Sequence, residues 1–487
     1  MSDPERFDLV VVGAGPAGEK GAAQAAYFGK KVCVIERAPK PGGAAVNTGT
    51  IPSKTLRETA LYFSGLKQRG LYGVDYHVQT DITVSDFMFR ERLVVEAQWD
   101  LIQKNFERHN VTVVQGTARF ADPHTLEVTR FREEPRHIRG DVVLIGTGSR
   151  PLRPADVPFD DTVIVDSDSL LRLQKIPARM VVIGGGVIGC EYASIFAALG
   201  VKVTIVNQRE RIMMQLDGEV SEVLRAELTR RLGISIMLNA EVAGIETNGE
   251  VGRVTLTDGS VVHGECVLYC AGREGNTSEL NLASAGVRTN ARGFILTDEN
   301  YRAAAEAVYA AGDVVGFPAL ASTAMEQARV AMCHAFDLKY KQRVSPVLPY
   351  GVWTIPEVAM VGETEESARA AGILYEIGKS SFTQNPRGLI VGDEGFVKLI
   401  FGVAGQRLLG AAIVGESACE LIHVAAGVLA VDGTIDFFIQ SVFNYPALSD
   451  AYKYAAYDGL QRLSKRASRR EGLRSITPNS ESNIQSA

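Results

Sequence analysis

Apolar runs alternate with amphipathic stretches along much of the chain, and the first such unit opens near the N-terminus. Phe7 to Val12 is largely apolar and β-branched at its end, which is typical of a strand buried in a parallel sheet. The turn Gly13-Ala-Gly15-Pro-Ala-Gly18 follows, and an alanine-rich helix is expected to reach about Phe28. A second strand is expected from Lys31 to Ile35. The pattern predicts a βαβ unit.

The same unit recurs later in the chain. Met180 to Ile183 predicts a strand, Gly184-Gly-Gly186-Val-Ile-Gly189 a turn, Glu191 to Leu199 a helix, and Val201 to Val206 a second strand. Two copies of one βαβ unit in a single chain predict two dinucleotide-binding domains.

The remaining segments fill in the organisation. The chain is expected to be helix-rich from Ser53 to Asn110 and strand-rich from Val111 to Gly148, with a further helix beginning near Ala321. From Pro346 to about Leu463 it has its own strands and a helix, which predicts a separate α+β domain. Beyond Ser464 apolar periodicity ends, so a disordered tail is expected.

Composition narrows the class of protein. A chain of 487 residues is too long for one compact core, and a net charge of −6 gives no reason to expect nucleic acid or an anionic membrane as a partner. No apolar run reaches the ~18 residues of a membrane span, and the first residues do not resemble a secretory signal. The six cysteines are scattered among apolar neighbours without metal-ligand spacing, as expected for buried thiols in a reducing cytoplasm.

The two glycine-rich turns are the first candidate sites. Each follows a strand and opens a helix, so its glycines let the backbone approach a pyrophosphate placed at the helix N-terminus. The alternative is that both are ordinary tight turns. One glycine motif alone would be weak evidence for a phosphate site, but here two of them occur in the same strand-turn-helix context. The predicted phosphate-binding glycines are Gly13, Gly15 and Gly18 in the first copy and Gly184, Gly186 and Gly189 in the second.

The residue after the second strand differs between the copies. Glu36 is placed to accept hydrogen bonds from an adenosine ribose and would repel a 2′-phosphate, so the first site is expected to hold FAD or NAD. Its counterpart is Asn207, with Arg209 and Arg211 close behind. A neutral amide does not repel a phosphate and an arginine can pair with one, so the second site is expected to accept NAD and NADP. Alternatively the arginines form a solvated edge, since Glu210 partly cancels them.

The stretch from Gly42 to Lys54 (Gly-Gly-Ala-Ala-Val-Asn-Thr-Gly-Thr-Ile-Pro-Ser-Lys) resembles the disulfide-oxidoreductase flavoproteins of the dihydrolipoamide dehydrogenase and glutathione reductase type. The resemblance runs from about Phe7 to Leu463. Further matches are Gly146-Thr147-Gly148, Ala271-Gly272-Arg273, Asn276-Thr277 and Ala311-Gly312-Asp313.

This resemblance implies roles for particular residues. Asp313 would hold the ribityl chain of FAD, and the helix beginning near Ala321 would point its positive end at the flavin pyrimidine. Lys54 would lie beside flavin N5, with Glu191 as its ion-pair partner. The matching stretches add four more cofactor-binding candidates, namely Gly43, Thr48, Gly148 and Gly272.

Both halves of the family's thiol chemistry are missing. Its redox cysteines are matched by Ala45 and Thr50, neither of which can form a thiolate. Its C-terminal His-Pro followed by Glu is matched by Tyr445-Pro446 and Asp450, and a tyrosine with a pKa of about 10 is a poor proton shuttle near neutral pH. The joint loss suggests an electron acceptor other than a disulfide.

One branch of the family, the soluble pyridine nucleotide transhydrogenases, combines a Gly-Thr-Ile-Pro-Ser-Lys stretch with Phe-Asn-Tyr-Pro near the C-terminus. This chain has both, at Gly49 to Lys54 and Phe443 to Pro446. It departs from that branch at Ala45, where a single cysteine is usual. A single cysteine cannot form an internal disulfide, so its loss need not abolish hydride exchange.

The resemblance to that branch implies ping-pong hydride transfer from NADPH through FAD to NAD⁺. An alternative is an NAD(P)H oxidase or diaphorase that passes electrons to oxygen, a quinone or a protein. A second alternative is a non-catalytic, nucleotide-sensing flavoprotein, against which the intact Lys54, Glu191 and Asp313 argue.

The expected fold class is α/β, with two Rossmann-like dinucleotide-binding domains and a C-terminal α+β dimerisation domain. By these patterns the FAD-binding domain occupies residues 1–160 and 281–345, the NAD(P)-binding domain 161–280, the dimerisation domain 346–465 and the disordered tail 466–487. The likeness of the C-terminal domain to the family's dimerisation domain implies a homodimer or a higher homo-oligomer.

Overall fold

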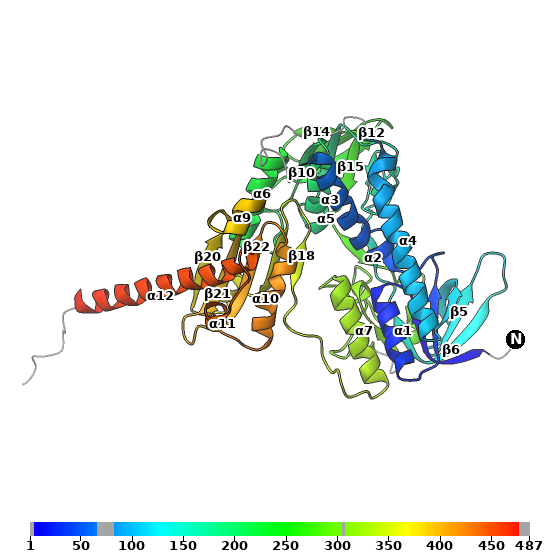
Figure 1. Cartoon of the computed structure of the whole chain (residues 1–487). Coiled ribbons are helices and arrows are strands. Elements are labelled where there is room, and N and C mark those ends of the chain that lie inside the picture. Colours follow the sequence, from blue (N-terminus) through cyan, green and yellow to red (C-terminus); the bar gives the residue numbers. More distant parts are fainter. Residues whose placement is uncertain (1–3, 66–81, 304–306, 477–487) are drawn as a thin grey trace, which may run out of the picture. The chain divides into compact units, whose positions relative to one another are not determined.

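The computed structural model describes residues 4–65, 82–303 and 307–476, which form two compact units (Figure 1). The first unit comprises the described residues up to 210 together with 232–346, and the second comprises 211–231 and the described residues from 347 onward. Within these ranges every helix is too short or too polar to cross a bilayer.

A seven-stranded sheet forms the base of the first unit, in the order β3-β2-β1-β6-β5-β4 with β17 against β6. Leu9 and Val11 of β1 pack on one face, against α1 and α7, while Val10 and Val12 pack on the other. The helices α1 and α7 lie side by side (Figure 1). The elements are β1 (Glu5–Val12), α1 (Pro16–Tyr27), β2 (Val32–Glu36), β3 (Thr112–Gln115), β4 (Thr117–Phe120), β5 (Thr125–Thr129), β6 (Arg136–Ile145), β17 (Val308–Ala310) and α7 (Ala321–Ala335).

A second, five-stranded sheet of the first unit is parallel throughout, in the order β11-β10-β9-β15-β8. Its first helix, α5, is buried over most of its length. The elements are β8 (Ile164–Val165), β9 (Arg179–Ile183), α5 (Val187–Ala198), β10 (Lys202–Val206), β11 (Ser235–Met237) and β15 (Cys266–Tyr269). The predicted pair of βαβ units, β1-α1-β2 and β9-α5-β10, is therefore confirmed.

Four further sets of elements complete the first unit. An antiparallel meander consists of β12 (Val242–Thr247), β13 (Gly252–Leu256) and β14 (Val261–Gly264). The short strands β7 (Ser149–Pro151) and β16 (Arg273–Gly275) pair antiparallel to each other. The region predicted to be helix-rich contains α2 (Gly43–Asn47), α3 (Thr50–Ser64) and α4 (Val84–Arg108), and part of it lies outside the described residues. Single turns of 3-10 helix occur at η1 (Ser169–Arg172), η2 (Leu282–Ala285) and η3 (Asp313–Val315).

The second unit is built on an antiparallel sheet in the order β18-β19-β22-β21-β20. Its core unites this sheet with α10 and the first half of α12, where Tyr452 stacks on Phe438 with ring centroids 5.0 Å apart. The strands are β18 (Tyr350–Val352), β19 (Val358–Gly362), β20 (Tyr375–Ser381), β21 (Phe396–Gly402) and β22 (Leu408–Val414). The helices are α6 (Gly218–Leu232), α8 (Glu365–Ala370), α9 (Pro386–Val391), α10 (Ala418–Ala430), α11 (Asp436–Gln440) and α12 (Ala451–Ile476), with 3-10 turns η4 (Phe382–Gln384) and η5 (Leu448–Asp450).

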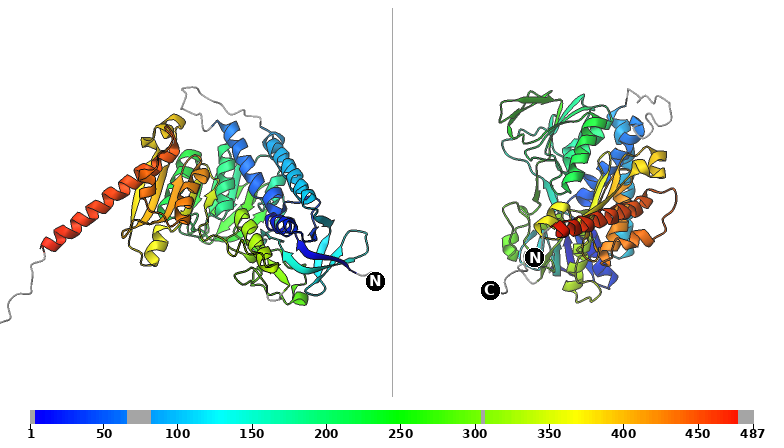
Figure 2. Two further views of the ribbon diagram at one scale, coloured as in Figure 1. Left: turned by 60° about the horizontal axis from the view of Figure 1, so that its bottom comes forward. Right: turned by 90° about the vertical axis from the view of Figure 1, so that its left-hand side faces the viewer.

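Two features differ from the sequence expectation. Residues 211–231, expected within the NAD(P)-binding domain, group by packing with the second unit, because Asp217 and its neighbours form a buried ion-pair network with residues of that unit. The tail was expected to be disordered from 466, but α12 continues to Ile476 and projects past the sheet (Figure 2). Arg and Lys propagate a helix well, so an existing helix can continue without an apolar stripe. Residues 477–487 lie outside the described residues.

Candidate functional site

The two glycine-rich turns share one geometry. Gly13 and Gly184 have φ angles of +99° and +115°, which disfavour any residue with a side chain. A Cβ on Gly18 would lie 1.8 Å from the carbonyl oxygen of Gly13, and one on Gly189 would lie 2.0 Å from that of Gly184. The middle glycine of the second turn, Gly186, has nothing within 4 Å of its Cβ position. Each turn thus presses its third glycine onto its first.

Both turns leave room and donors for an anion. Gly15 and Gly186 are the N-cap residues of α1 and α5, and neither helix start has a side-chain cap. The backbone N–H groups at these helix starts therefore remain available for a phosphate. In the first turn Gly43 approaches Gly15 so closely that a Cβ on Gly43 would lie 2.8 Å from the Cα of Gly15. This contact places α2 directly on the first glycine turn.

The residue that ends the second strand contacts the glycine turn in both copies. Glu36 Oε2 accepts the N–H of Ala14 at 2.7 Å, and its Oε1 accepts the N–H of Ala38 at 2.8 Å. In the second copy Asn207 Oδ1 accepts the N–H of Gly185 at 3.1 Å, while its Nδ2 donates to the carbonyl of Arg209 at 3.1 Å. The side chains of Glu36 and Asn207 are thus structural equivalents. Two residues further along, the backbone offers Glu36 an N–H group, that of Ala38, whereas it offers Asn207 a carbonyl, that of Arg209.

The two arginines after Asn207 have different surroundings. Arg211 donates to Glu366 Oε1 at 3.2 Å and to the carbonyl oxygens of Met214 and Leu216. The side chain of Arg209 is exposed and contacts no partner among the described residues. Arg209 is therefore the arginine available to a ligand, and Arg211 stabilises its own loop.

Lys54 of α3 and Glu191 of α5 form the ion pair that the family resemblance implies. Lys54 Nζ donates to both carboxylate oxygens, at 2.9 and 2.7 Å. The Glu191 side chain is 5% exposed and that of Lys54 25%. A carboxylate this buried requires a partner cation, so the pair fixes the ammonium group of Lys54. The position of Lys54 beside a flavin stays a prediction.

The two positions matched to the family's redox cysteines carry no thiol. Ala45, in α2, is half-buried and Thr50, the first residue of α3, is exposed. All six cysteines of the chain are free, and five of them are buried, as predicted. Burial raises the pKa of the Cys270 thiol to about 12, so even the least buried cysteine is protonated at neutral pH.

A ladder of hydrogen bonds ends at Asp313. Arg273 of β16 donates its Nε to Ser149 Oγ at 2.8 Å and a terminal N–H to the Ser149 carbonyl at 2.8 Å. Ser149 Oγ in turn donates to Asp313 Oδ2 at 3.0 Å. The N–H of Asn276 donates to the carbonyl of Gly148 at 3.0 Å. The carbonyl of Gly272 accepts the N–H of Leu152 at 3.0 Å. The predicted positions Gly148, Gly272 and Asp313 thus all lie next to or bond to residues of the paired strands β7 and β16 or the residues that flank them.

The start of α7 was only partly foreseen. The helix begins at Ala321 without a side-chain cap, as the expectation of a free positive end requires. Sequence reasoning missed Thr323 and Gln327, which are both 3% exposed. Gln327 Oε1 accepts the N–H of Gly312 at 2.8 Å, whereas the hydroxyl of Thr323 is buried without a partner. In the sequence these two polar residues are four positions apart near the start of a predicted helix, which places them on one face of its first turns. This spacing is the signal that could have identified them.

Several of these features fit FAD. Thr323 Oγ1 and Thr147 Oγ1 are among the described polar atoms of the first unit that are buried without partners, as expected where a polar ligand completes the hydrogen bonding. The uncapped starts of α1 and α7 supply free N–H groups. The residues that would hold FAD come from several elements, and they are the first glycine turn, Glu36, Thr48 after α2, Lys54 of α3, Gly148 and Asp313.

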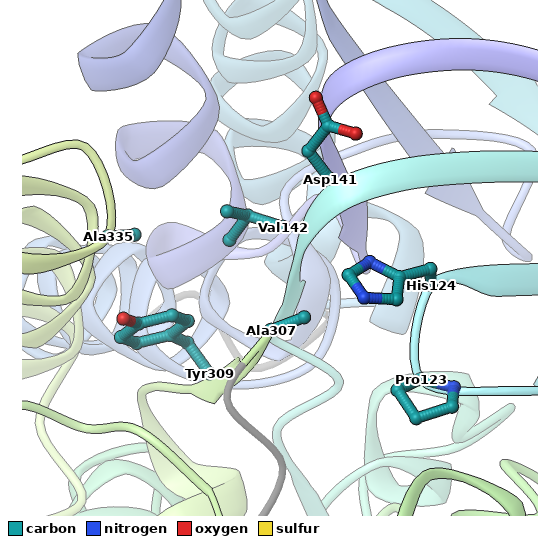
Figure 3. A pocket seen from close by; sticks show the side chains of 7 residues that line it. All are labelled: Pro123, His124, Asp141, Val142, Ala307, Tyr309 and Ala335. Atoms are coloured by element: carbon teal, nitrogen blue, oxygen red, sulfur yellow. The ribbon is translucent and has the colours of Figure 1, made fainter.

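A cavity of about 540 Å³ lies elsewhere in the first unit, beside strands β6 and β17 (Figure 3). Its polar side chains do not converge, because the Asp141 carboxylate points away from the His124 ring (Figure 3). The Tyr309 hydroxyl is hydrogen-bonded to His334 Nδ1 at 2.8 Å. This cavity contains none of the predicted site residues and no candidate chemistry. It is lined by Pro123, His124, Asp141, Val142, Ala307, Tyr309 and Ala335.

Comparison with known proteins gives one consistent result. The family profile described as pyridine nucleotide-disulphide oxidoreductase matches residues 7–328, and its dimerisation domain matches residues 348–456. A soluble pyridine nucleotide transhydrogenase of Mycobacterium bovis is 42% identical over 460 residues, which cover 94% of this chain and 98% of the relative. A protein of the same name from Vibrio atlanticus is 37% identical over 467 residues, or 95% of this chain and all of the relative.

Solved structures agree with this assignment. The crystal structure of LpdA from Mycobacterium tuberculosis matches with a TM-score of 0.85 at 28% identity, covering 93% of this chain and 99% of that one. The HOCl-induced flavoprotein disulfide reductase RclA from Escherichia coli matches with a TM-score of 0.82 at 26% identity, over the same shares.

Proposed function

The chain belongs to the pyridine nucleotide-disulphide oxidoreductase family, and from this premise we propose that it catalyses hydride transfer between NADPH and NAD⁺ at a bound FAD. Relatives named soluble pyridine nucleotide transhydrogenase, 37–42% identical over most of the chain, support this reaction. It is an oxidoreductase that uses FAD and nicotinamide nucleotides without a disulfide.

FAD, when bound, accepts a hydride from one nicotinamide and returns it to another. The protein supplies positive charge next to it, from the Lys54 ammonium held by Glu191 and from the uncapped start of α7. The second glycine turn and Asn207 bind the nucleotide that arrives or leaves. Arg209 pairs with a 2′-phosphate when the nucleotide carries one and extends into solvent when it does not.

A single combination carries the proposal: the Lys54–Glu191 pair is intact while the two redox positions are Ala45 and Thr50. Keeping the Glu191 carboxylate buried is costly, and the pair holds a positive charge in place for hydride chemistry. Without thiols at these positions, electrons cannot pass to a disulfide. A second nicotinamide nucleotide, entering the site that the first has left, is the acceptor for which the chain retains a binding site.

The test is a two-step anaerobic reduction of the purified yellow protein. NADPH is added until the flavin bleaches, and a chromogenic analogue of NAD⁺ follows. Return of the yellow colour together with formation of the reduced analogue supports the proposal. A flavin that stays reduced until oxygen or a quinone is admitted replaces it with an oxidase or diaphorase. A flavin that neither NADPH nor NADH bleaches leaves only a nucleotide-sensing role.

We infer further that the protein is a homodimer formed through residues 348–456, which match the family's dimerisation domain. In this part of the second unit Phe437, Val442 and Tyr445 are 49%, 95% and 75% exposed, and a partner subunit would withdraw them from water. Tyr445 stands where the family has a catalytic histidine, and here we assign it to the subunit interface. Light scattering of the holoprotein should give twice the mass of the chain, and a monomer would contradict this.

A further inference from the structure

The two βαβ units place their glycine turns against equivalent parts of the chain. In the first, β6 runs parallel to β1, and a Cβ on Gly13 would lie 2.7 Å from the carbonyl oxygen of Gly146, just after β6. In the second, β15 runs parallel to β9, and a Cβ on Gly184 would lie 3.0 Å from the carbonyl oxygen of Cys270, just after β15. The segment after β6 and the segment after β15 therefore each support one glycine turn.

Ser149 and Arg273 occupy the same place in these two segments, since each follows its supporting carbonyl group by three residues. Ser149 is the first residue of β7 and Arg273 the first of β16, and the two strands pair antiparallel. Arg273 donates its Nε to Ser149 Oγ and a terminal N–H to the Ser149 carbonyl, both at 2.8 Å. One arginine thus binds the side chain and the backbone of its equivalent in the other βαβ unit.

The chemistry of the three groups sets the direction of the hydrogen bonds in the Arg273–Ser149–Asp313 ladder. A guanidinium can only donate, so Ser149 Oγ is the acceptor of the Arg273 bond. The single hydroxyl proton of Ser149 then goes to Asp313 Oδ2, 3.0 Å away, because a carboxylate can only accept. Among the described residues no group donates to the other oxygen, Asp313 Oδ1. This oxygen remains for a hydroxyl of the ribityl chain of FAD.

Burial makes the ladder sensitive to the loss of one member. Ser149 is 6% exposed, and a polar group withdrawn from water loses more free energy when its hydrogen-bond partner is removed. The next residues along the same two strands, Arg150 and Glu274, are an instructive contrast. They form an ion pair at 2.7 Å with 49% and 30% of their side chains exposed, so water can replace either partner.

We propose that Ser149 and Arg273 are positioning residues for hydride transfer, which hold the segment under the second glycine turn against the segment that orients Asp313. The inference rests on the proposed function, because it takes Asp313 as a ligand of FAD and the second turn as the nucleotide site. Arg273 comes from the nucleotide side and acts on Asp313 through Ser149. Loss of this contact should therefore displace the flavin relative to the arriving nucleotide without weakening the nucleotide's own site.

The test is a double-mutant cycle of Ser149→Ala and Arg273→Met on the full chain. Each single variant should raise the Kd of FAD about tenfold, measured by quenching of FAD fluorescence on titration into apoprotein. At full FAD occupancy each should also slow bleaching by saturating NADPH about ten- to a hundredfold, because hydride transfer tolerates little displacement of the reacting atoms. The double variant should lose little more than either single variant, because both break the same ladder.

The NADPH concentration that gives half the maximal bleaching rate separates positioning from nucleotide binding. In both single variants it should stay within about twofold of the parent. Arg150→Met is the matched control, since it makes the same substitution at the neighbouring exposed pair, and it should behave as the parent in every measurement. If Arg273→Met fails to fold, Ser149→Ala breaks the ladder by removing one hydroxyl group and decides the question.

Additive losses in the double variant would overturn the proposal, as would an FAD affinity that is unchanged in Ser149→Ala and Arg273→Met alike. A half-maximal NADPH concentration that rises as far as the bleaching rate falls would assign Arg273 to nucleotide binding and overturn it too. The bleaching step uses NADPH alone and the FAD titration uses no nucleotide. A parent that bleaches but does not reduce NAD⁺ would therefore contradict the proposed transhydrogenation while the role of the ladder is still measured.

Discussion

Lys398 of β21 offers the sharpest test of what stabilises the second unit. Its side chain is fully buried, and Nζ donates to Asp217 Oδ1 at 2.9 Å, lies 3.0 Å from Glu219 Oε2 and also pairs with Glu365. Asp217 precedes α6 and is 2% exposed, so its charge cannot turn to water. The substitution Lys398→Met removes the cation and keeps most of the alkyl volume.

The expected cost follows from this burial. Removing one partner of a buried ion pair leaves an uncompensated charge and typically costs about 3–5 kcal/mol. Asp217 would retain backbone N–H bonds from Glu219 and Glu365, at 3.1 and 3.2 Å, which argues for the lower end, about 3 kcal/mol. Lys379→Met is the matched control. It also pairs with Glu219, but with 28% and 38% of the two side chains exposed, so its loss should cost at most about 1 kcal/mol.

The assay is urea denaturation of the holoprotein followed by tryptophan fluorescence. The chain has two tryptophans, Trp99 in the first unit and Trp353 in the second. Trp353 packs against the core of the second unit, so in a Trp99→Phe background the signal reports that unit. Lys398→Met should lower the midpoint of this transition well below that of Lys379→Met. Adding Asp217→Asn to Lys398→Met should recover most of the loss, because the buried charge is then gone.

The pH dependence has a definite sign. Burial alone would raise the pKa of Asp217, but the hydrogen bond and charge of Lys398 lower it overall. The stabilisation is thus present above the pKa of an unfolded aspartate, about 3.9, and is lost as the pH falls through the lowered folded value. In Lys398→Met burial dominates and the same pKa rises, so mild acid should narrow the gap to the parent. A gap equal to that of Lys379→Met, or one that widens in acid, would refute this reasoning.

Three further predictions concern the candidate site. Glu191→Gln removes the charge that fixes Lys54 and should slow flavin bleaching by NADPH about a hundredfold with little change in KM. Stopped-flow absorbance measures the bleaching rate, and an unchanged rate would contradict this role of the pair. Arg209→Ala should raise KM for NADPH about ten- to a hundredfold and leave NADH unaffected, and equal effects on both would contradict its assignment. Gly18→Ala should yield colourless protein, whereas Gly189→Ala should stay yellow and resist reduction by either nucleotide, because each new Cβ would collide with a carbonyl oxygen of its own turn. Retained reactivity in both variants would show that the turns tolerate the methyl group.

Much of the fold was predictable because its signals are local. A strand, a glycine turn and a helix follow one another within some thirty residues, so each βαβ unit is visible in a single window. The Lys54–Glu191 pair joins distant residues, and only the resemblance to a family implied it. Periodicity alone cannot pair two residues on separate helices.

The features that the sequence could not predict are those for which two similar residues, or two conformations, fit the same role. In Asp166-Ser-Asp-Ser169 the sequence allows either aspartate to accept the N–H groups of the turn. In the structure Asp166 does so, and its other carboxylate oxygen accepts Arg153. Arg153 lies about equally far from both aspartates along the chain, so the sequence does not show which of them it contacts. The continuation of α12 past Lys465 is a similar case, because polar residues fit a helix and a tail equally well. Likewise Arg209 and Arg211 have the same chemistry, and they are distinguished by the partners that the fold gives Arg211, which are two carbonyl oxygens of its own loop and Glu366 far along the chain.

The position shared by Glu36 and Asn207 combines two effects in one side chain. A carboxylate has only acceptors, so the peptide after β2 must present an N–H to it, as Ala38 does. An amide has a donor as well, and Asn207 uses it to hold the carbonyl of Arg209. Replacing the carboxylate by an amide therefore removes a charge that would repel a 2′-phosphate and fixes the backbone of Arg209, the arginine proposed to bind one. A single site that serves NADPH and NAD⁺ in turn needs both, since a permanent negative charge would exclude the first nucleotide and an unrestrained arginine would bind it less specifically.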